Sequence, residues 1–243
     1  MALPSVDDHL AWLRAEGLRL GEVAAATPLS LPVPGCPEWD VEALLRHVGG
    51  VHRWAAGIVR ERLMARPNRD DHGPGDREGL IAWYRDGHLE LLDALARAAP
   101  DELCWTWLPG SRPLAFWARR QAHETAIHRL DVEQAGGTAT PFPAVAAADG
   151  VDELLTLAAL RGRVPDGGGR RLHLAATDTP GEWVIELHPD CLIVRSGDSD
   201  GDLSVRAPAT DLFALVMNRR EATGLDLEGD ADVLRAWRDS VHF

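Results

Sequence analysis

The sequence predicts an α+β protein with a four-helix bundle over residues 1–142 and a small α/β domain with an antiparallel sheet over residues 143–243. Two observations predict this division. Before residue 142 apolar residues recur at helical spacing in four long segments, whereas after it several short segments alternate between apolar and polar residues. A chain of 243 residues is long enough for one large or two modest domains.

The first predicted helix covers residues 8–26 and is followed by a connector, residues 27–39, that contains four prolines. Proline favours extended backbone before it, so we expect this connector to be extended. It leads to Asp40, a residue type that caps helices. Trp39 and Leu44 occupy the positions of a hydrophobic staple around that cap. A helix therefore begins after Asp40.

The second predicted helix, residues 41–64, has one apolar face with a histidine at each edge. His47 and His52 are about 140° apart on a helical projection, so a straight helix cannot direct both at one metal ion. The spacing alone does not choose between them. The third predicted helix covers residues 79–99, and His88 on its apolar face is a weaker ligand candidate that we interpret as packing.

The fourth predicted helix, residues 116–137, carries most of the candidate site residues. Pro113 precedes it and Gly136-Gly137 follow it, as is usual at helix ends. Glu124, His128 and Asp131 fall within roughly 60° of one another on its surface. His123 lies on a neighbouring apolar stripe, which indicates packing.

The second half of the chain changes character after a proline-bearing linker. Alternating segments bounded by Gly, Pro and Asp predict short strands. The predicted elements are a helix over 149–160, strands over 171–177, 182–188, 191–195 and 202–207, and helices over 208–220 and 229–240.

The composition excludes several classes of function. A net charge of −13 argues against a nucleic-acid partner, because phosphate binding needs clustered Lys and Arg. The N-terminus does not read as a signal peptide and no apolar run is long enough to cross a membrane, so we expect a cytoplasmic protein that does not bind membranes. Its three cysteines form no CxxC pair, which excludes a zinc knuckle. We expect a monomer or a weak homodimer.

Glu124 and His128, four residues apart on one helix, are candidate metal ligands. Such a pair is often only a weak surface ion pair. Here, however, the second helix brings another imidazole, from His47 or His52, and a helical bundle places metal ligands on facing helices. Two imidazoles and one carboxylate suit a catalytic Zn²⁺ with an open fourth position, and also Fe²⁺ or Ni²⁺.

Two stretches, CPEWDVEALLRHVGGVHRW (36–54) and WARRQAHETAIHRLDVE (117–133), resemble the mycothiol-dependent maleylpyruvate isomerase family. That family has a DinB-like metal-binding four-helix bundle and a sterol-carrier-like C-terminal domain, and the resemblance continues into GEWVIEL, DLFALVMNRR and LEGDADVLRAW. It implies that His47, Glu124 and His128 bind the metal, which leaves His52 as a non-ligand. It also implies that Asp131 orients a ligand or Arg129, and that Arg219, or next to it Arg220, serves the thiol cosubstrate.

The resemblance implies an enzyme that uses mycothiol and a divalent metal, with Zn²⁺ as the first choice. A metal-bound thiolate would attack an electrophilic small molecule, either as an S-transferase or as a cis-trans isomerase. Two alternatives remain open at this point. The protein could be a non-catalytic small-molecule-binding protein, or a metal-dependent hydrolase that uses a bound water.

Overall fold

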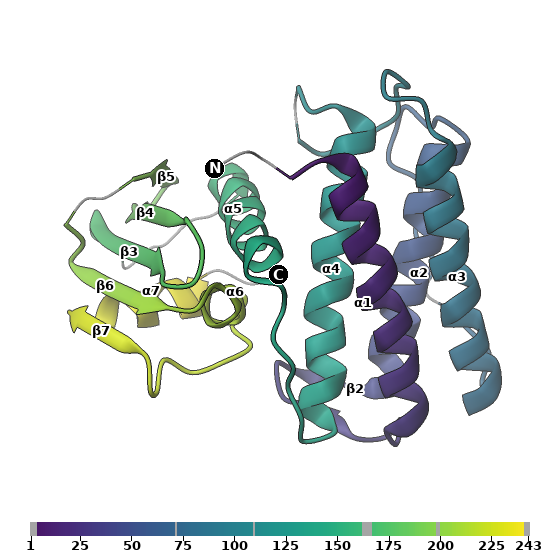
Figure 1. The fold of residues 1–243 in the computed structure, drawn as a ribbon, viewed down its shortest axis with the longest axis horizontal. Coiled ribbons are helices and arrows are strands. Elements are labelled where there is room, and N and C mark those ends of the chain that lie inside the picture. The colour runs from purple at the N-terminus through teal and green to yellow at the C-terminus, as the bar shows by residue number, and fades with distance from the viewer. Residues whose placement is uncertain (1–3, 71, 109, 162–166, 198–199, 241–243) are drawn as a thin grey trace. The chain divides into compact units, whose positions relative to one another are not determined.

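The computed structural model describes residues 4–70, 72–108, 110–161, 167–197 and 200–240. The chain divides into two compact units, the first over Pro4–Thr140 and the second from Pro141 onward. The first is helical and the second contains a five-stranded sheet with helices (Figure 1). The predicted α+β fold class is therefore confirmed. Within these described ranges, no helix is long and apolar enough to span a membrane.

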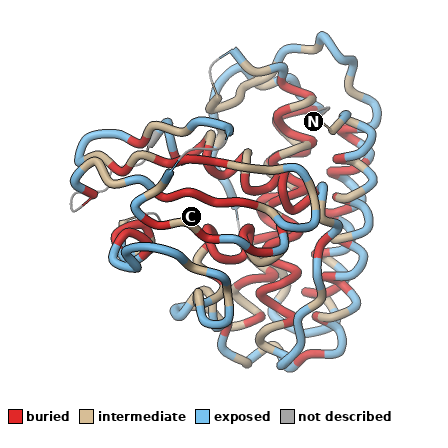
Figure 2. Tube along the Cα trace, turned by 60° about the vertical axis from the view of Figure 1, so that its left-hand side comes forward, coloured by how far each residue is buried: buried red, intermediate tan, exposed pale blue. Residues whose placement is uncertain are grey.

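The first unit is a bundle of four helices that lie side by side (Figure 1). Helix α1 packs mainly against α4, and α2 against α3. Figure 2 shows the buried positions in red along these helices. The connector between α1 and α2 is not wholly irregular, because β1 (Pro32–Val33) and β2 (Cys36–Asp40) pair in a short antiparallel hairpin. The helices are α1 (Val6–Ala26), α2 (Val41–Arg60), α3 (Arg77–Arg97) and α4 (Pro113–Ala135).

Local chemistry fixes the ends of the two helices that carry the candidate ligands. The Asp40 carboxylate accepts the N–H of Ala43 at 2.8 Å, so Asp40 is the N-cap of α2 as predicted. Pro113 is the first residue of α4, where its missing N–H costs nothing. Helix α4 ends where Gly137 takes a φ of 78°, a left-handed conformation that favours glycine. Both helices thus have a defined register.

Gly49 allows α2 and α3 to approach closely. A Cβ at this position would lie 2.2 Å from the Trp83 ring, which is closer than real atoms come. The Arg53 guanidinium lies 4.3 Å from the centroid of the same ring and donates to the Trp83 carbonyl at 2.7 Å. The indole of Trp83 is therefore packed between the backbone of α2 at Gly49 and the side chain of Arg53.

A buried ion network joins the C-terminal end of α4 to α1. Arg129 donates to Glu16 at 2.7 Å and to Glu133 at 2.8 Å, and Arg19 also donates to Glu133 at 2.7 Å. The side chains of Arg129 and Glu133 are each only 1% exposed. Charges buried this deeply require such pairing, so the network fixes the end of α4 against α1.

The sheet of the second unit has the strand order β5-β4-β3-β6-β7. The predicted antiparallel sheet is mixed in the structure, because β6 lies parallel to β3. Alternation shows which residues share a face of a strand but not the direction of its neighbour, so the sequence could not reveal this. The strand β7 was not predicted, since its four residues are too few to show a period. The strands are β3 (Arg170–Ala176), β4 (Glu182–Leu187), β5 (Leu192–Ser196), β6 (Leu203–Ala207) and β7 (Asp226–Gly229).

Three helices accompany this sheet: α5 (Ala144–Arg161), α6 (Ala209–Val216) and α7 (Asp232–Ser240). Helix α5 begins inside the predicted linker. Helix α6 ends four residues before the predicted residue 220, because Asn218 takes a left-handed φ of 59°. The N–H of Arg219 then bonds to the Ala214 carbonyl at 2.7 Å, which closes the helix end.

Candidate metal centre

Helix α2 presents its two histidines to different surroundings. His47 is 18% exposed, and its Nε2 lies 3.4 Å from Glu124 Oε1 on α4. His52 is fully buried, and its Nε2 lies 2.9 Å from the Thr125 hydroxyl oxygen. Of the two histidines that helical spacing left open, the structure therefore brings His47 to Glu124.

Helix α4 supplies Glu124 and His128 from adjacent turns. His128 Nε2 lies 3.5 Å from Glu124 Oε1, the same oxygen that faces His47. One candidate ligand atom from each of the three residues lies within 4.8 Å of the others. The His47 and His128 rings are 5.2 Å apart and nearly perpendicular. The three side chains thus converge on one point between α2 and α4.

Asp131 is fully buried and lies behind His128. Its Oδ2 is 2.9 Å from His128 Nδ1, so the carboxylate accepts the proton on that nitrogen and leaves Nε2 directed at Glu124. This is how a carboxylate commonly orients a histidine ligand. Of the two roles predicted for Asp131, the structure gives the contact with the candidate ligand, while Arg129 takes part in the ion network described above.

The charges around the site favour an ionised carboxylate and a positive imidazole. Burial raises the pKa of Glu124, but Arg120, whose Nη2 lies 2.5 Å from Oε2, and the two imidazoles outweigh it and hold that pKa well below its usual range. Burial likewise lowers the pKa of His128, yet Asp131 and Glu124 raise it overall to about 9. Because a histidine must be neutral to bind a metal, a cation at this site would displace the second proton of His128.

Four residues at the site were not predicted. The Trp39 ring lies 4.7 Å from that of His47 and 6.1 Å from that of His128. Arg69 Nη2 lies 3.3 Å from His47 Nδ1, and Cys36 Sγ lies 4.0 Å from Asp131 Oδ2. Arg120 stands four residues before Glu124, so helical spacing could have revealed it. The other three come from a hairpin and a loop, for which the sequence carries no such signal.

The remaining histidines of the bundle that we interpreted as packing have neighbours on other helices. His123 lies against the rings of His9 and Trp12 of α1, at 5.9 and 6.4 Å. His88 lies 5.4 Å from His52 and stacks on Tyr84. Burial lowers the pKa of His88 to about 4, which keeps this imidazole neutral.

Arg219 and Arg220 belong to the second unit. Arg219 is 8% exposed and donates to the Met217 carbonyl at 2.8 Å. Arg220 pairs with Asp211 and donates to the carbonyls of Glu221 and Thr223. Much of the hydrogen-bonding capacity of Arg220 is thus used locally, and its role toward a cosubstrate stays a prediction, as does that of Arg219.

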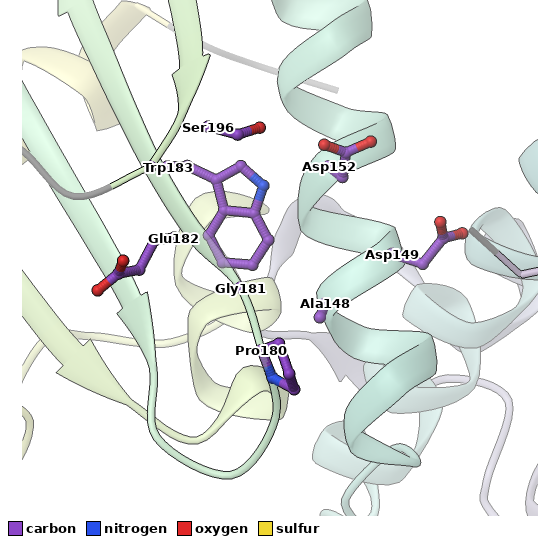
Figure 3. A pocket seen from close by; sticks show the side chains of 9 residues that line it. Ala148, Asp149, Asp152, Pro180, Gly181, Glu182, Trp183 and Ser196 are labelled. Atoms are coloured by element: carbon purple, nitrogen blue, oxygen red, sulfur yellow. The ribbon is translucent and has the colours of Figure 1, made fainter. Parts of the chain in front are cut away.

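The second unit also has a hollow of about 330 Å³ between α5 and the strands β4 and β5 (Figure 3). Trp183 and Asp152 face each other across it, with Ser196 nearby (Figure 3). We assign no ligand to this hollow.

The helical unit matches a known family. Residues 10–133 match the model of the mycothiol maleylpyruvate isomerase N-terminal domain, which is about half of the chain and includes all the converging residues. The chain belongs to this family. No curated protein sequence matches it.

Two solved structures are similar to the whole chain. Both are crystal structures of the mycothiol-dependent maleylpyruvate isomerase, one with a histidine replaced by alanine. The variant has a TM-score of 0.62 at 13% identity, and the other a TM-score of 0.60 at 14% identity. In both cases the match covers 94% of this chain and 96% of the other. At this identity the likeness shows a shared fold.

Proposed function

We propose that the protein is a metal-dependent enzyme that uses mycothiol, as an S-transferase or as a cis-trans isomerase of the maleylpyruvate isomerase type. The observation that carries this proposal is the convergence of His47, Glu124 and His128 within 4.8 Å. Family membership and the likeness to the mycothiol-dependent maleylpyruvate isomerase support it.

The residues fit a divalent cation. Arg120 is bonded to Glu124 Oε2, which leaves Oε1 facing both imidazoles. Asp131 holds the Nδ1 side of His128, so Nε2 is directed inward. Two imidazole nitrogens and one carboxylate oxygen suit Zn²⁺ with an open position, with Fe²⁺ and Ni²⁺ as alternatives.

When bound by these residues, a divalent cation would lower the pKa of a thiol in its open position, which is about 8.5 for a free thiol. The chain's own groups prepare the site. Asp131 fixes the His128 ring, Arg120 fixes Glu124, and the indole of Trp39 covers both imidazoles with an apolar wall. In a transferase the new carbon–sulfur bond stays in the product. In an isomerase it forms on an alkene and breaks again after rotation. We retain Arg219, and after it Arg220, as candidates for contacting mycothiol.

Metal content tests the site directly. We expect purified protein to carry about one divalent metal per chain by mass spectrometry, and His128→Ala to lose it. His72→Ala is the matched control, because the His72 side chain is 95% exposed on a loop and its loss should leave metal content unchanged. Equal metal content in wild type and His128→Ala would refute the proposed site.

Turnover tests the chemistry. We expect loaded protein to consume an electrophile from a panel of activated alkenes and alkyl halides when mycothiol is present, and not with buffer alone. Turnover without thiol would identify a hydrolase instead. Inertness toward the whole panel, despite bound metal and thiol, would identify a binding protein.

A further inference from the structure

His47 and His128 differ in the group that faces the nitrogen pointing away from Glu124. For His128 that group is the Asp131 carboxylate, which accepts a proton from Nδ1. For His47 it is the Arg69 guanidinium, at 3.3 Å from Nδ1. An arginine side chain has only donors and keeps its charge, so His47 Nδ1 must offer its lone pair.

This contact determines where His47 carries its proton. A neutral imidazole that accepts at Nδ1 is protonated at Nε2, and that N–H then points at Glu124 Oε1, 3.4 Å away. A metal bound at Nε2 needs the opposite tautomer, with the proton on Nδ1. That proton would face the Arg69 N–H at 3.3 Å, donor against donor. Arg69 in this position therefore disfavours a cation at His47 Nε2.

The loop that carries Arg69 is attached to α2 on both sides of this residue. Trp54 donates to the Pro67 carbonyl at 3.0 Å. Arg46 donates to the carbonyls of Gly73 and Pro74 at 2.6 and 2.7 Å. Arg69 itself is exposed, so its side chain can move away without opening the core. The attached loop backbone keeps the Arg69 guanidinium close to His47, and the exposed side chain of Arg69 can still move away from it.

We propose that Arg69 is a positioning residue that competes with the divalent cation for His47, holding the imidazole in the tautomer that does not ligate until the cation displaces it. This inference rests on the proposed function. It predicts that Arg69 weakens metal affinity, although it is not a ligand, and that metal binding moves Arg69 away from His47.

The test compares Arg69→Met with Arg66→Met. Both changes remove one positive charge from the same loop, but Arg66 lies over the Trp54 ring, 5.9 Å from its centroid. Zn²⁺ affinity is measured by competition with a chromophoric chelator. We expect Arg69→Met to bind Zn²⁺ about five-fold more tightly than wild type, the effect of one hydrogen bond, and Arg66→Met to change affinity less than two-fold. Equal tightening in both variants would reduce the effect to charge and overturn the inference.

Nitrogen chemical shifts of the imidazoles give a second readout that needs no metal. In metal-free wild type we expect His47 to be protonated at Nε2, and in Arg69→Met to shift toward the Nδ1 tautomer. A wild-type His47 already protonated at Nδ1 would overturn the inference. Tight Zn²⁺ binding with equal affinity in wild type and Arg69→Met would also overturn the inference about Arg69 but would leave the proposed function intact. Absence of Zn²⁺ binding in both proteins would overturn the inference and the proposed function together.

Discussion

The two histidines of α2 stand five residues apart and meet very different surroundings. His47 reaches a carboxylate at a partly exposed site, whereas His52 reaches the Thr125 hydroxyl in the core. Glu124 and Thr125 are neighbours on α4, so a single step along that helix separates the two partners. Residue type alone therefore does not determine what a histidine does in this bundle.

The same contrast appears in their neighbours. His128, with Asp131 and Glu124 beside it, has its pKa raised to about 9. Burial, together with the nearby His88, holds the pKa of His52 well below its usual range. Nearby carboxylates outweigh burial for His128 but not for His52, and this separates a set of candidate ligands from a set of neutral packing residues.

Glu124→Gln should have the largest effect on metal binding. It replaces the charged group that faces His47 by a neutral amide, so that both histidines of α2 then face an uncharged partner. One ligand of a zinc site contributes roughly a quarter of a total of 10–16 kcal/mol. We therefore expect the free energy of Zn²⁺ binding to weaken by about 2.5–4 kcal/mol in chelator competition. Glu61→Gln is the control, because Glu61 forms an exposed ion pair with Arg60. An unchanged affinity would place the cation elsewhere.

The buried neutral histidines, His52 and His88, should make the stability of the protein depend on pH in the acid range. The pKa of His88 in the folded state, about 4, is below its unfolded value of 6.5, so the unfolded chain binds this proton first as the pH falls. Stability from this residue is therefore complete above pH 6.5 and decreases by about 3 kcal/mol toward pH 4.

Urea unfolding of wild type and His88→Gln across pH 4–7 measures this effect. We expect the difference between the two proteins to shrink as the pH falls, since the variant has no proton to gain. Parallel curves over the whole range would contradict a buried neutral imidazole at residue 88.

Asp131→Asn tests whether the carboxylate behind His128 contributes to metal binding. The amide keeps the shape of the carboxylate but loses the charge that orients His128. We expect Zn²⁺ affinity to fall about 10–100-fold, as usual for groups that orient a ligand. Asp93→Asn, at an exposed pair on α3, should leave affinity unchanged, and a similar loss there would argue for a general charge effect.

Thr125→Val should have the smallest effect, and it should change the stability of the core around His52 without changing metal binding. It removes the partner of His52 Nε2 while preserving shape, so we expect a loss of about 1 kcal/mol of stability in urea unfolding. Thr125→Ser, which keeps the hydroxyl, should recover most of it. Zn²⁺ affinity should stay at the wild-type value, and a change of more than two-fold would show that the two sets are coupled.

Much of the fold could be predicted because its signals are local. Asp40 caps α2 through its own side chain, and the glycines after Ala135 end α4, so these boundaries follow from neighbouring residues. The parallel pairing of β6 with β3 depends on how distant strands meet. No local pattern contains that information.

The candidate site divides in the same way. Glu124, His128 and Asp131 share one helix, so their convergence follows from helical spacing. Choosing His47 over His52 required the family resemblance, because both lie at edges of one apolar face. The contacts of Trp39 and Arg69 with His47 depend on a hairpin and a loop folding over the helices, which periodicity does not describe.

The contact of Gly49 with Trp83 has a consequence for how this protein can evolve. Even one added methyl group at residue 49 would meet the indole at 2.2 Å, so a larger residue there requires the Trp83 side chain to shift or residue 83 to become smaller. Among relatives that keep this helix spacing, we expect the two positions to change together, with glycine at 49 wherever 83 is tryptophan. Residue 49 lies two positions after His47, so this constraint would also preserve the register of a helix that carries a candidate ligand.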